Sequence, residues 1–237
     1  MLFFRPLFER GIDFFNISDK SYITTRKTME LILNGLLTTF TITIVALIFG
    51  MFLAIGLCMC RTLEIPGLNQ FAKAYINTFR SLPLVIVLLG FYLVAPEILR
   101  TALGIHGDIR MACALVAFSL FEAAYFAEIL RSGFNAIPQG QKDACKALGF
   151  TTWQSYRIVF IPQAIKNSLP VLFTQAIILF QDTSIVYILG LTDLFGSAKK
   201  LGEMSGTIPQ WILGATVAYM LISICLQRVA NKLGARA

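Results

Sequence analysis

Polar residues interrupt two of the long apolar runs in this sequence. Glu122 lies deep in one run, and a second run contains four consecutive polar residues, Gln181, Asp182, Thr183 and Ser184. Such side chains are costly against lipid, so each must face protein or water. The carboxylates could bind a cationic group of a solute, and the hydroxyls could hydrogen-bond an anionic one. Two interpretations stay open: the lining of a translocation path, or structural contacts within the chain and to an adjacent subunit.

Patterns that would indicate catalysis or cofactor binding are missing from the sequence. It contains no G-x-x-x-x-G-K-[ST] phosphate-binding loop, no H-E-x-x-H pattern, and one histidine. Its five cysteines lack the spacing of metal ligands or of a disulfide framework. Glu128 and Arg131, three residues apart, are spaced for a structural ion pair rather than for chemistry. We therefore expect a non-catalytic chain that binds no cofactor or metal, and a membrane-embedded hydrolase is disfavoured.

The elements that carry these residues are expected to be membrane helices. Hydrophobic residues make up 57% of the chain and charged residues 14%, whereas about 25% of the residues in a typical soluble domain are charged. At 237 residues, the chain can hold about five spans of ~20 residues in one all-α domain. The apolar runs are residues 31–60, 81–96, 111–134, 163–191 and 208–227.

The remaining segments follow from these runs. Residues 1–30 form a polar lead, residues 31–230 the membrane domain, and residues 231–237 a basic tail. The run at 81–96 is too short to span alone, so it must borrow residues from its flanks. Residues 192–207 are expected to form a loop. The net charge of +7 is scattered between the apolar runs, which favours membrane topology over nucleic-acid binding as its explanation.

One stretch between the runs, residues 139–164, is too polar to cross a bilayer and too regularly patterned for a linker. A short helix is expected over Gln141–Leu148, with Asp143 in its first turn, where a carboxylate complements the helix dipole. Gly149 offers the left-handed residue that closes such a helix.

A second short helix is expected directly afterwards. Thr151 and Gln154 have the spacing of a capping box, and Pro162 would stop the helix that follows. In the first helix, small or apolar side chains are available to an approaching surface, at Ala144, Cys145 and Leu148. The residue pattern is equally consistent with two structures: a hairpin that docks on another protein, and an amphipathic hairpin that lies on the membrane surface.

Residues 139–164 resemble the cytoplasmic "EAA" loop of ABC importer permeases, in which Glu-Ala-Ala precedes three residues, Gly, nine residues and Ile-x-Leu-Pro. Ala144, Gly149 and Pro162 match this pattern, and conservative replacements stand at Asp143, Cys145, Val159 and Ile161. The literal Glu-Ala-Ala at 122–124 lies inside an apolar run and is not this loop.

Further strings resemble the polar amino acid permeases within that superfamily. They are F-R-S-L-P-L at 79–84, F-E-A-A-Y-F-A-E-I-L-R-S-G at 121–133 and L-G-F-T-T-W-Q-S at 148–155. I-L-F-Q-D-T-S-I-V-Y-I-L at 178–189 is most similar to permease subunits of glutamate/aspartate importers. The resemblance covers roughly residues 30–230 and implies the type I ABC importer permease fold.

The resemblance also implies partners. The helix of the loop would insert into a groove of an ATPase subunit, through Asp143, Ala144, Cys145, Leu148, Gly149 and Pro162. A dimer of ATPase subunits would use ATP, and a periplasmic or extracellular binding protein would deliver a polar amino acid. A second permease subunit would complete the pore, as a homodimer or a heterodimer. Membrane lipids surround the chain, and no nucleic-acid partner is expected.

The distribution of basic residues between the loops predicts how the chain is oriented in the membrane. With the N-terminus outside, five spans place eleven of the 20 basic residues on the inside, a small excess. The resemblance implies the same topology in a bacterial inner membrane, with the docking loop and the C-terminus in the cytoplasm.

An amino acid in a low-dielectric site needs partners for both its ammonium and its carboxylate. Asp182 or Glu122 could meet the ammonium, and Thr183 or Ser184 the carboxylate. Arg80, at the start of an apolar run, is a candidate for a second substrate carboxylate or an anchor at the membrane interface. Selectivity that resides wholly in the binding protein is the alternative.

A secondary amino acid carrier, which needs no ATPase, is the alternative from another class. Five spans without a visible inverted repeat, together with a long docking loop, disfavour it.

Overall fold

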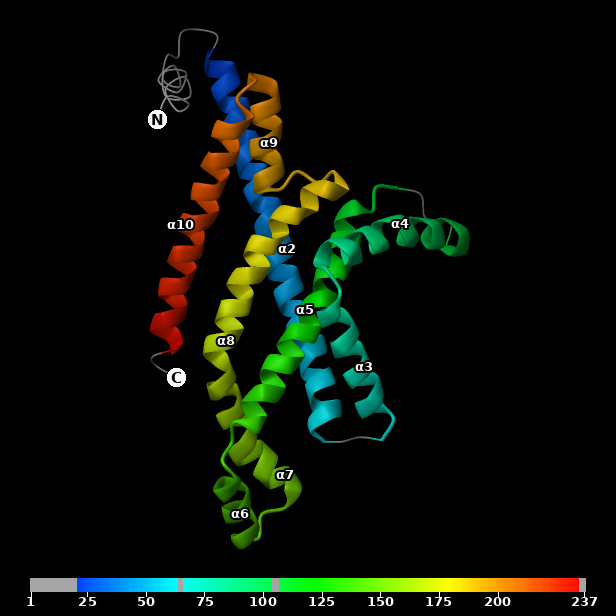
Figure 1. The fold of residues 1–237 in the computed structure, drawn as a ribbon, viewed down its shortest axis with the longest axis vertical. Helices are drawn as coiled ribbons and strands as arrows, with labels where there is room; N and C mark the ends of the chain where they lie inside the picture. The colour runs from blue at the N-terminus through cyan, green and yellow to red at the C-terminus, as the bar shows by residue number, and fades with distance from the viewer. Residues whose placement is uncertain (1–20, 64–65, 104–106, 235–237) are drawn as a thin grey trace, which may run out of the picture.

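A computed structural model describes residues 21–63, 66–103 and 107–234, so most of the predicted lead and the end of the tail lie outside the described residues. The described elements are all helical (Figure 1). In chain order they are α2 (Ser21–Thr62), α3 (Leu68–Ser81), α4 (Leu84–Leu103), α5 (Arg110–Asn135), α6 (Gln139–Ala147), α7 (Thr152–Gln154), the π-helical segment η2 (Ser155–Phe160), α8 (Ile161–Asp182), the 3₁₀ segment η3 (Thr183–Leu189), α9 (Leu194–Ser205) and α10 (Ile208–Gly234).

Four helical stretches are long and apolar enough to cross a bilayer: Thr25–Thr62, Arg110–Asn135, Thr152–Leu189 and Ile208–Lys232. Helices α3 and α4 meet the same criterion only as a pair, bent by 105° at the break between them. Counted as one broken span, they bring the total to the five expected from the sequence.

Pro83 explains the bend between α3 and α4. A proline disfavours the helical conformation of the residue before it, and Leu82 is extended, with φ −97° and ψ 139°. Helix α4 starts directly after the proline, at Leu84. The predicted borrowing from the flanks is confirmed, although the borrowed residues form a second helix at an angle.

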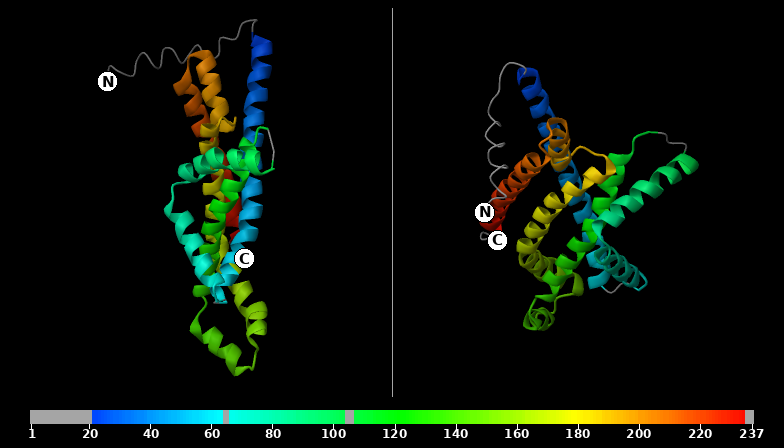
Figure 2. Two further views of the ribbon diagram at one scale, coloured as in Figure 1. Left: turned by 90° about the vertical axis from the view of Figure 1, so that its right-hand side faces the viewer. Right: turned by 45° about the horizontal axis from the view of Figure 1, so that its top comes forward.

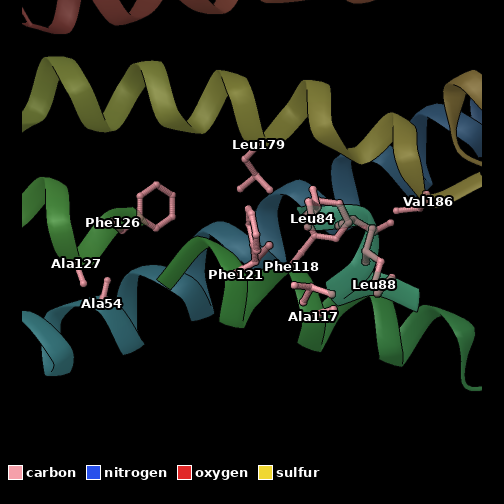
Figure 3. Packing of buried hydrophobic residues seen from close by; sticks show 14 of the residues in the cluster. Ala54, Leu84, Leu88, Ala117, Phe118, Phe121, Phe126, Ala127, Leu179 and Val186 are labelled. Atoms are coloured by element: carbon pink, nitrogen blue, oxygen red, sulfur yellow. The ribbon is translucent and has the colours of Figure 1, made fainter. Parts of the chain in front are cut away.

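Helix α5 is the centre of the molecule and packs against α2, α3, α4 and α8. Large side chains of α5 fill the space toward its neighbours; Figure 3 shows Phe118 and Phe121 near Leu179 of α8. Small residues bring the backbones together elsewhere, as at Gly133, where an added Cβ would lie 2.5 Å from the carbonyl oxygen of Ala164.

Residues 194–205 form helix α9, so the prediction of a loop over residues 192–207 was wrong for most of that segment. Asp193 begins the helix by accepting hydrogen bonds from the backbone N–H groups of Phe195 (3.1 Å) and Gly196 (2.9 Å). Helix α9 packs against α2 and lies beside its first half (Figures 1 and 2), and one face of α9 is buried. Gly35 of α2 permits this contact, because a Cβ there would lie 2.5 Å from the Asp193 carbonyl oxygen.

The helices also extend beyond the apolar runs. Helix α2 begins ten residues before the run at 31–60, and its exposed first turns carry an Arg26–Glu30 ion pair of 3.1 Å. Helix α10 continues past the run at 208–227 to Gly234. The apolar runs show only which residues are suited to the hydrocarbon core of a membrane. The helices are longer than these runs because backbone hydrogen bonding continues into the polar residues on either side.

Candidate functional site

The predicted docking hairpin consists of α6, α7 and the start of η2, and it lies beyond the adjoining ends of α2 and α3 (Figure 1). Helix α6 begins at Gln139, two residues earlier than predicted, directly after Pro138. Asp143 therefore lies in the second turn of the helix and not in the first, so the predicted dipole interaction was wrong. Its carboxylate instead accepts a hydrogen bond from Gln139 Nε2 (3.1 Å).

Gly149 closes α6 as predicted. It has φ +70°, and the backbone N–H groups of Gly149 and Phe150 donate to the carbonyls of Lys146 and Cys145, both at 3.0 Å. This is the Schellman arrangement, in which a left-handed residue satisfies the last carbonyls of a helix.

The capping box at Thr151 and Gln154 is also confirmed. Gln154 N–H donates to Thr151 Oγ1 (3.3 Å), and Thr151 N–H donates to Gln154 Oε1 (2.8 Å). Pro162, however, does not stop this helix. The backbone widens into the π-helical turn η2, where Ile161 N–H bonds to Tyr156 O, and then continues as α8. The wider turn gives the proline ring room where a regular α-helix would bring it against a carbonyl.

The free surface of the hairpin carries large apolar side chains among its polar ones. Leu148, Trp153 and Ile158 are 72%, 64% and 59% exposed. Ala144 is exposed as well, whereas Cys145 is buried inside the hairpin at 4% exposure. Among the predicted contact residues, Ala144 and Leu148 are thus available to a partner, and Gly149 shapes the turn that presents them.

The buried carboxylate of Glu122 has a partner that the sequence did not reveal. Glu122 is fully buried, and its Oε2 accepts a hydrogen bond from Gln175 Nε2 of α8 at 3.1 Å. Its other oxygen has no hydrogen-bond partner among the described residues. Asp182 is half-buried seven residues after Gln175, two helical turns along α8. The sequence did offer one indication of Gln175: it is a polar residue inside an apolar run, about two helical turns before the quartet.

The polar quartet does not converge on one point. Gln181 Nε2 donates to Ser223 Oγ of α10 (3.0 Å), and Ser184 lines the same hollow of about 690 Å³ between α8 and α10. Thr183 is fully buried and donates to the Phe180 carbonyl (2.6 Å). At this residue the backbone tightens from α to 3₁₀ geometry without a break.

Arg80 belongs to an arginine cluster around Glu128. Arg80 lies 3.9 Å from the Glu128 carboxylate, and its guanidinium is stacked 5.6 Å from the centre of the Tyr125 ring. The predicted pair of Glu128 with Arg131 is confirmed. Arg61 joins the same carboxylate at 3.1 Å, a contact between residues 67 apart that no local spacing could indicate.

A cavity of about 480 Å³ connects this cluster with the partner of Glu122. It is lined by Arg80, Tyr125, Glu128, Asn167 and Gln175, among others. Of the predicted substrate-path residues, Arg80 lines this cavity, and Glu122 does not, although its hydrogen-bond partner Gln175 does. Gln181 and Ser184 line a different hollow.

Known proteins are similar to this chain over most of its length. GltK of Escherichia coli O6:H1, a glutamate/aspartate import permease protein, is 45% identical over 207 residues, covering 86% of this chain and 92% of that protein. ArtQ of Bacillus subtilis, an arginine transport system permease protein, is 34% identical over 194 residues, covering 81% of this chain and 86% of that protein.

Solved structures agree. A crystal structure of an amino acid ABC transporter with histidines superimposes with a TM-score of 0.81 at 25% identity, over 92% of this chain and 99% of that chain. The MetNI methionine ABC transporter shares the fold, with a TM-score of 0.71 at 20% identity, over 89% and 97%. The sequence profile of the family described as "binding-protein-dependent transport system inner membrane component" matches residues 46–237. The chain belongs to this family of membrane permease components.

Proposed function

We propose that the chain is the permease subunit of an ATP-driven importer of polar amino acids, with glutamate and aspartate as the favoured substrates. The observation that carries the proposal is the helical hairpin at residues 139–160, held by the Schellman turn and the capping box. The relative named as a glutamate/aspartate import permease supports the choice of substrate. Family membership favours this function over the secondary carrier.

The hairpin is proposed to dock on an ATPase subunit, which hydrolyses ATP in place of this chain. Its exposed apolar side chains, Leu148 and Trp153, supply contact area, and Ala144 permits close approach. Asp143 and Lys142 flank that surface with opposite charges. Pro162 contributes through the wide turn that joins the hairpin to α8.

The substrate path is proposed to pass the cavity at Arg80. Its guanidinium would supply the cation that a second substrate carboxylate needs. Glu122 and Asp182, which do not line this cavity, remain the candidates for the substrate ammonium. Gln181 and Ser184 line the hollow beside α10, and Thr183 lies between them in sequence. A second permease subunit, identical or different, is proposed to complete the pore at this side.

The orientation is proposed to be N-terminus outside and C-terminus in the cytoplasm of a bacterial inner membrane. The end of α10 points toward the end of the bundle that carries α6 and α7 (Figure 1). A docking hairpin that meets a cytoplasmic ATPase would thus place the end of α10 on the cytoplasmic side. A binding protein would deliver substrate at the opposite end.

The test is uptake of radiolabelled glutamate by proteoliposomes that contain the chain with its co-purifying subunits. Wild-type uptake should require ATP, and Gly149→Val should abolish it and release the ATPase, because valine is strongly disfavoured at φ +70°. Gly140→Val is the matched control, since Gly140 lies on the same hairpin with open space around it and no left-handed φ. Uptake that needs no ATP and is unchanged in Gly149→Val would refute the proposal and favour a secondary carrier.

A further inference from the structure

A cationic cavity lies where the ends of α2, α3 and α5 meet the hairpin. It has a volume of about 470 Å³, and four cationic side chains line it: Arg61, Lys73, Arg131 and Lys142. No carboxylate is among its lining residues. Glu128 neutralises part of the charge of the two arginines, whereas Lys73 and Lys142 form no ion pair with any described residue. The cavity therefore offers uncompensated positive charge to an anion.

An apolar groove adjoins this cavity. It has a volume of about 590 Å³ and is lined almost wholly by apolar atoms of α2, α5 and α8, together with Thr152, Trp153 and Tyr156 of the hairpin. Its α2 residues run from Met51 to Thr62, so the groove follows the last three turns of a helix that is apolar enough to span a membrane. A groove with this lining suits a lipid acyl chain.

Three residues line both hollows: Thr62, Phe134 and Tyr156. Tyr156 donates its hydroxyl hydrogen to the Thr62 carbonyl oxygen (3.3 Å), and its ring lies 6.2 Å from that of Phe134. The cationic cavity and the apolar groove thus adjoin one another at these three side chains, and the two together form an amphipathic depression.

We propose that this depression binds an anionic phospholipid, with the phosphate in the cationic cavity and one acyl chain in the apolar groove. Basic pockets between membrane helices are suited to anionic headgroups. An acidic segment of a soluble partner could match the cations alone, but it would leave the adjoining apolar groove unfilled. The site needs only that the spans lie in a membrane, so it stands or falls separately from the transport function.

The consequence is a lipid wedged between the spans and the hairpin. Lys142 belongs to α6, whereas Lys73 belongs to α3, so a phosphate held by both ties the hairpin to the membrane domain. Phosphatidylglycerol is a suitable probe because it carries one phosphate and no cationic group.

The chain offers a direct optical test. It contains two tryptophans, Trp153 at the groove and Trp211 at the start of α10, at the opposite end of the bundle. In full-length chain carrying Trp211→Phe, Trp153 fluorescence reports quenching by lipids brominated on their acyl chains. Brominated phosphatidylglycerol should quench at a lower mole fraction in neutral-lipid micelles than brominated phosphatidylcholine.

Lysine variants test the headgroup contact. Lys73→Gln and Lys142→Gln should each lower the preference for phosphatidylglycerol about fivefold, which corresponds to about 1 kcal/mol. Lys146→Gln is the matched control, because Lys146 carries the same charge on α6 but does not line the cavity. Equal quenching by the two lipids, or equal effects of all three variants, would show that Trp153 meets only bulk lipid and would overturn the proposal.

Further experiments distinguish a bound phospholipid from a free anion or a protein partner in the cavity. Inorganic phosphate and a short-chain phosphatidylglycerol should compete poorly, because neither fills the groove; full competition by phosphate would reduce the site to a free-anion site. Met59→Phe, which narrows the groove without changing charge, should weaken quenching by the anionic lipid. If Lys73→Gln leaves lipid preference intact and weakens retention of the ATPase subunit, the cavity is a protein contact and the lipid proposal fails.

Discussion

The side-chain amide of Gln175 donates to the carboxylate of Glu122 at 3.1 Å, and this bond joins the middle of α5 to α8. Both helices are candidate spans, so the bond is made at a depth where water is scarce. If the bond is structural, replacing either Glu122 or Gln175 should lower the stability of the protein. If Glu122 acts in the substrate path, replacing it should reduce transport without lowering stability.

Gln175→Leu should destabilise the protein by about 2 kcal/mol or more, because it leaves a buried carboxyl without its donor. Glu122→Gln should cost less than about 1 kcal/mol, since an amide oxygen can accept the same hydrogen bond. Thermal unfolding in detergent measures both. Should Glu122→Gln abolish uptake at an unchanged unfolding temperature, Glu122 acts in the substrate path.

Gly133→Ala should destabilise the crossing of α5 and α8 by about 1–3 kcal/mol, since the added methyl meets the backbone carbonyl of Ala164. Gly56→Ala in α2 is the control: its Cβ would have no neighbour within 4 Å, and it should be neutral or slightly stabilising. Similar unfolding temperatures for the two variants would contradict the close approach of these helices.

Glu128→Gln should destabilise the end of the bundle that carries the arginine cluster by about 2–4 kcal/mol, because three arginines lose one shared partner. A double-mutant cycle of Glu128→Gln with Arg61→Gln isolates their interaction and should give a coupling energy of about 1–2 kcal/mol. A coupling near zero would mean that the pair adds nothing to stability beyond its neighbours.

Stability should depend on pH through Asp193, the buried cap of α9. Burial raises the pKa of its carboxyl from the ordinary value of 3.8 to about 6, although hydrogen bonds from Gly196, Phe195 and Tyr219 oppose this effect. Because the folded pKa lies above the unfolded one, the native state binds the proton more tightly. This contribution is fully present below about pH 4 and is lost as the pH rises through about 6.

The matching variant is Asp193→Asn, which keeps the capping geometry without a titratable group. The difference between the folded and unfolded pKa of Asp193 corresponds to about 3 kcal/mol of unfolding free energy. The unfolding temperature of the wild type should therefore fall relative to that of Asp193→Asn between pH 4 and pH 6.5. Parallel curves over this range would place the Asp193 pKa near its ordinary value.

The sequence predicted the features that depend on local chemistry. Gly149, the Thr151–Gln154 box and the Glu128–Arg131 pair each involve residues within one or two helical turns, and all three were confirmed. Helix α9 was missed because its apolar residues are few, although Asp193 before it is a good capping residue. The prediction at Pro162 was wrong because a π-helical turn lets the helix continue past the proline.

The contacts that build the cavities could not be predicted in this way. Arg61 reaches Glu128 across 67 residues, and Gln175 reaches Glu122 across 53. Such pairs depend on how α2, α5 and α8 cross, which is set by small residues such as Gly133 that have no pattern of their own. Hydropathy indicates the spans but not the faces that they turn to one another.

The wide turn at η2 has a mechanical consequence. Because the backbone runs without interruption from Thr152 to Leu189, the hairpin and the polar quartet are two ends of one rod of 38 residues, roughly 57 Å long at 1.5 Å per residue. A displacement of the hairpin near Trp153 would be carried along a helix that contains no loop. The π-helical turn and Pro170 are the two places where this helix can bend, so Asp182 would move with the hairpin as long as both places stay straight.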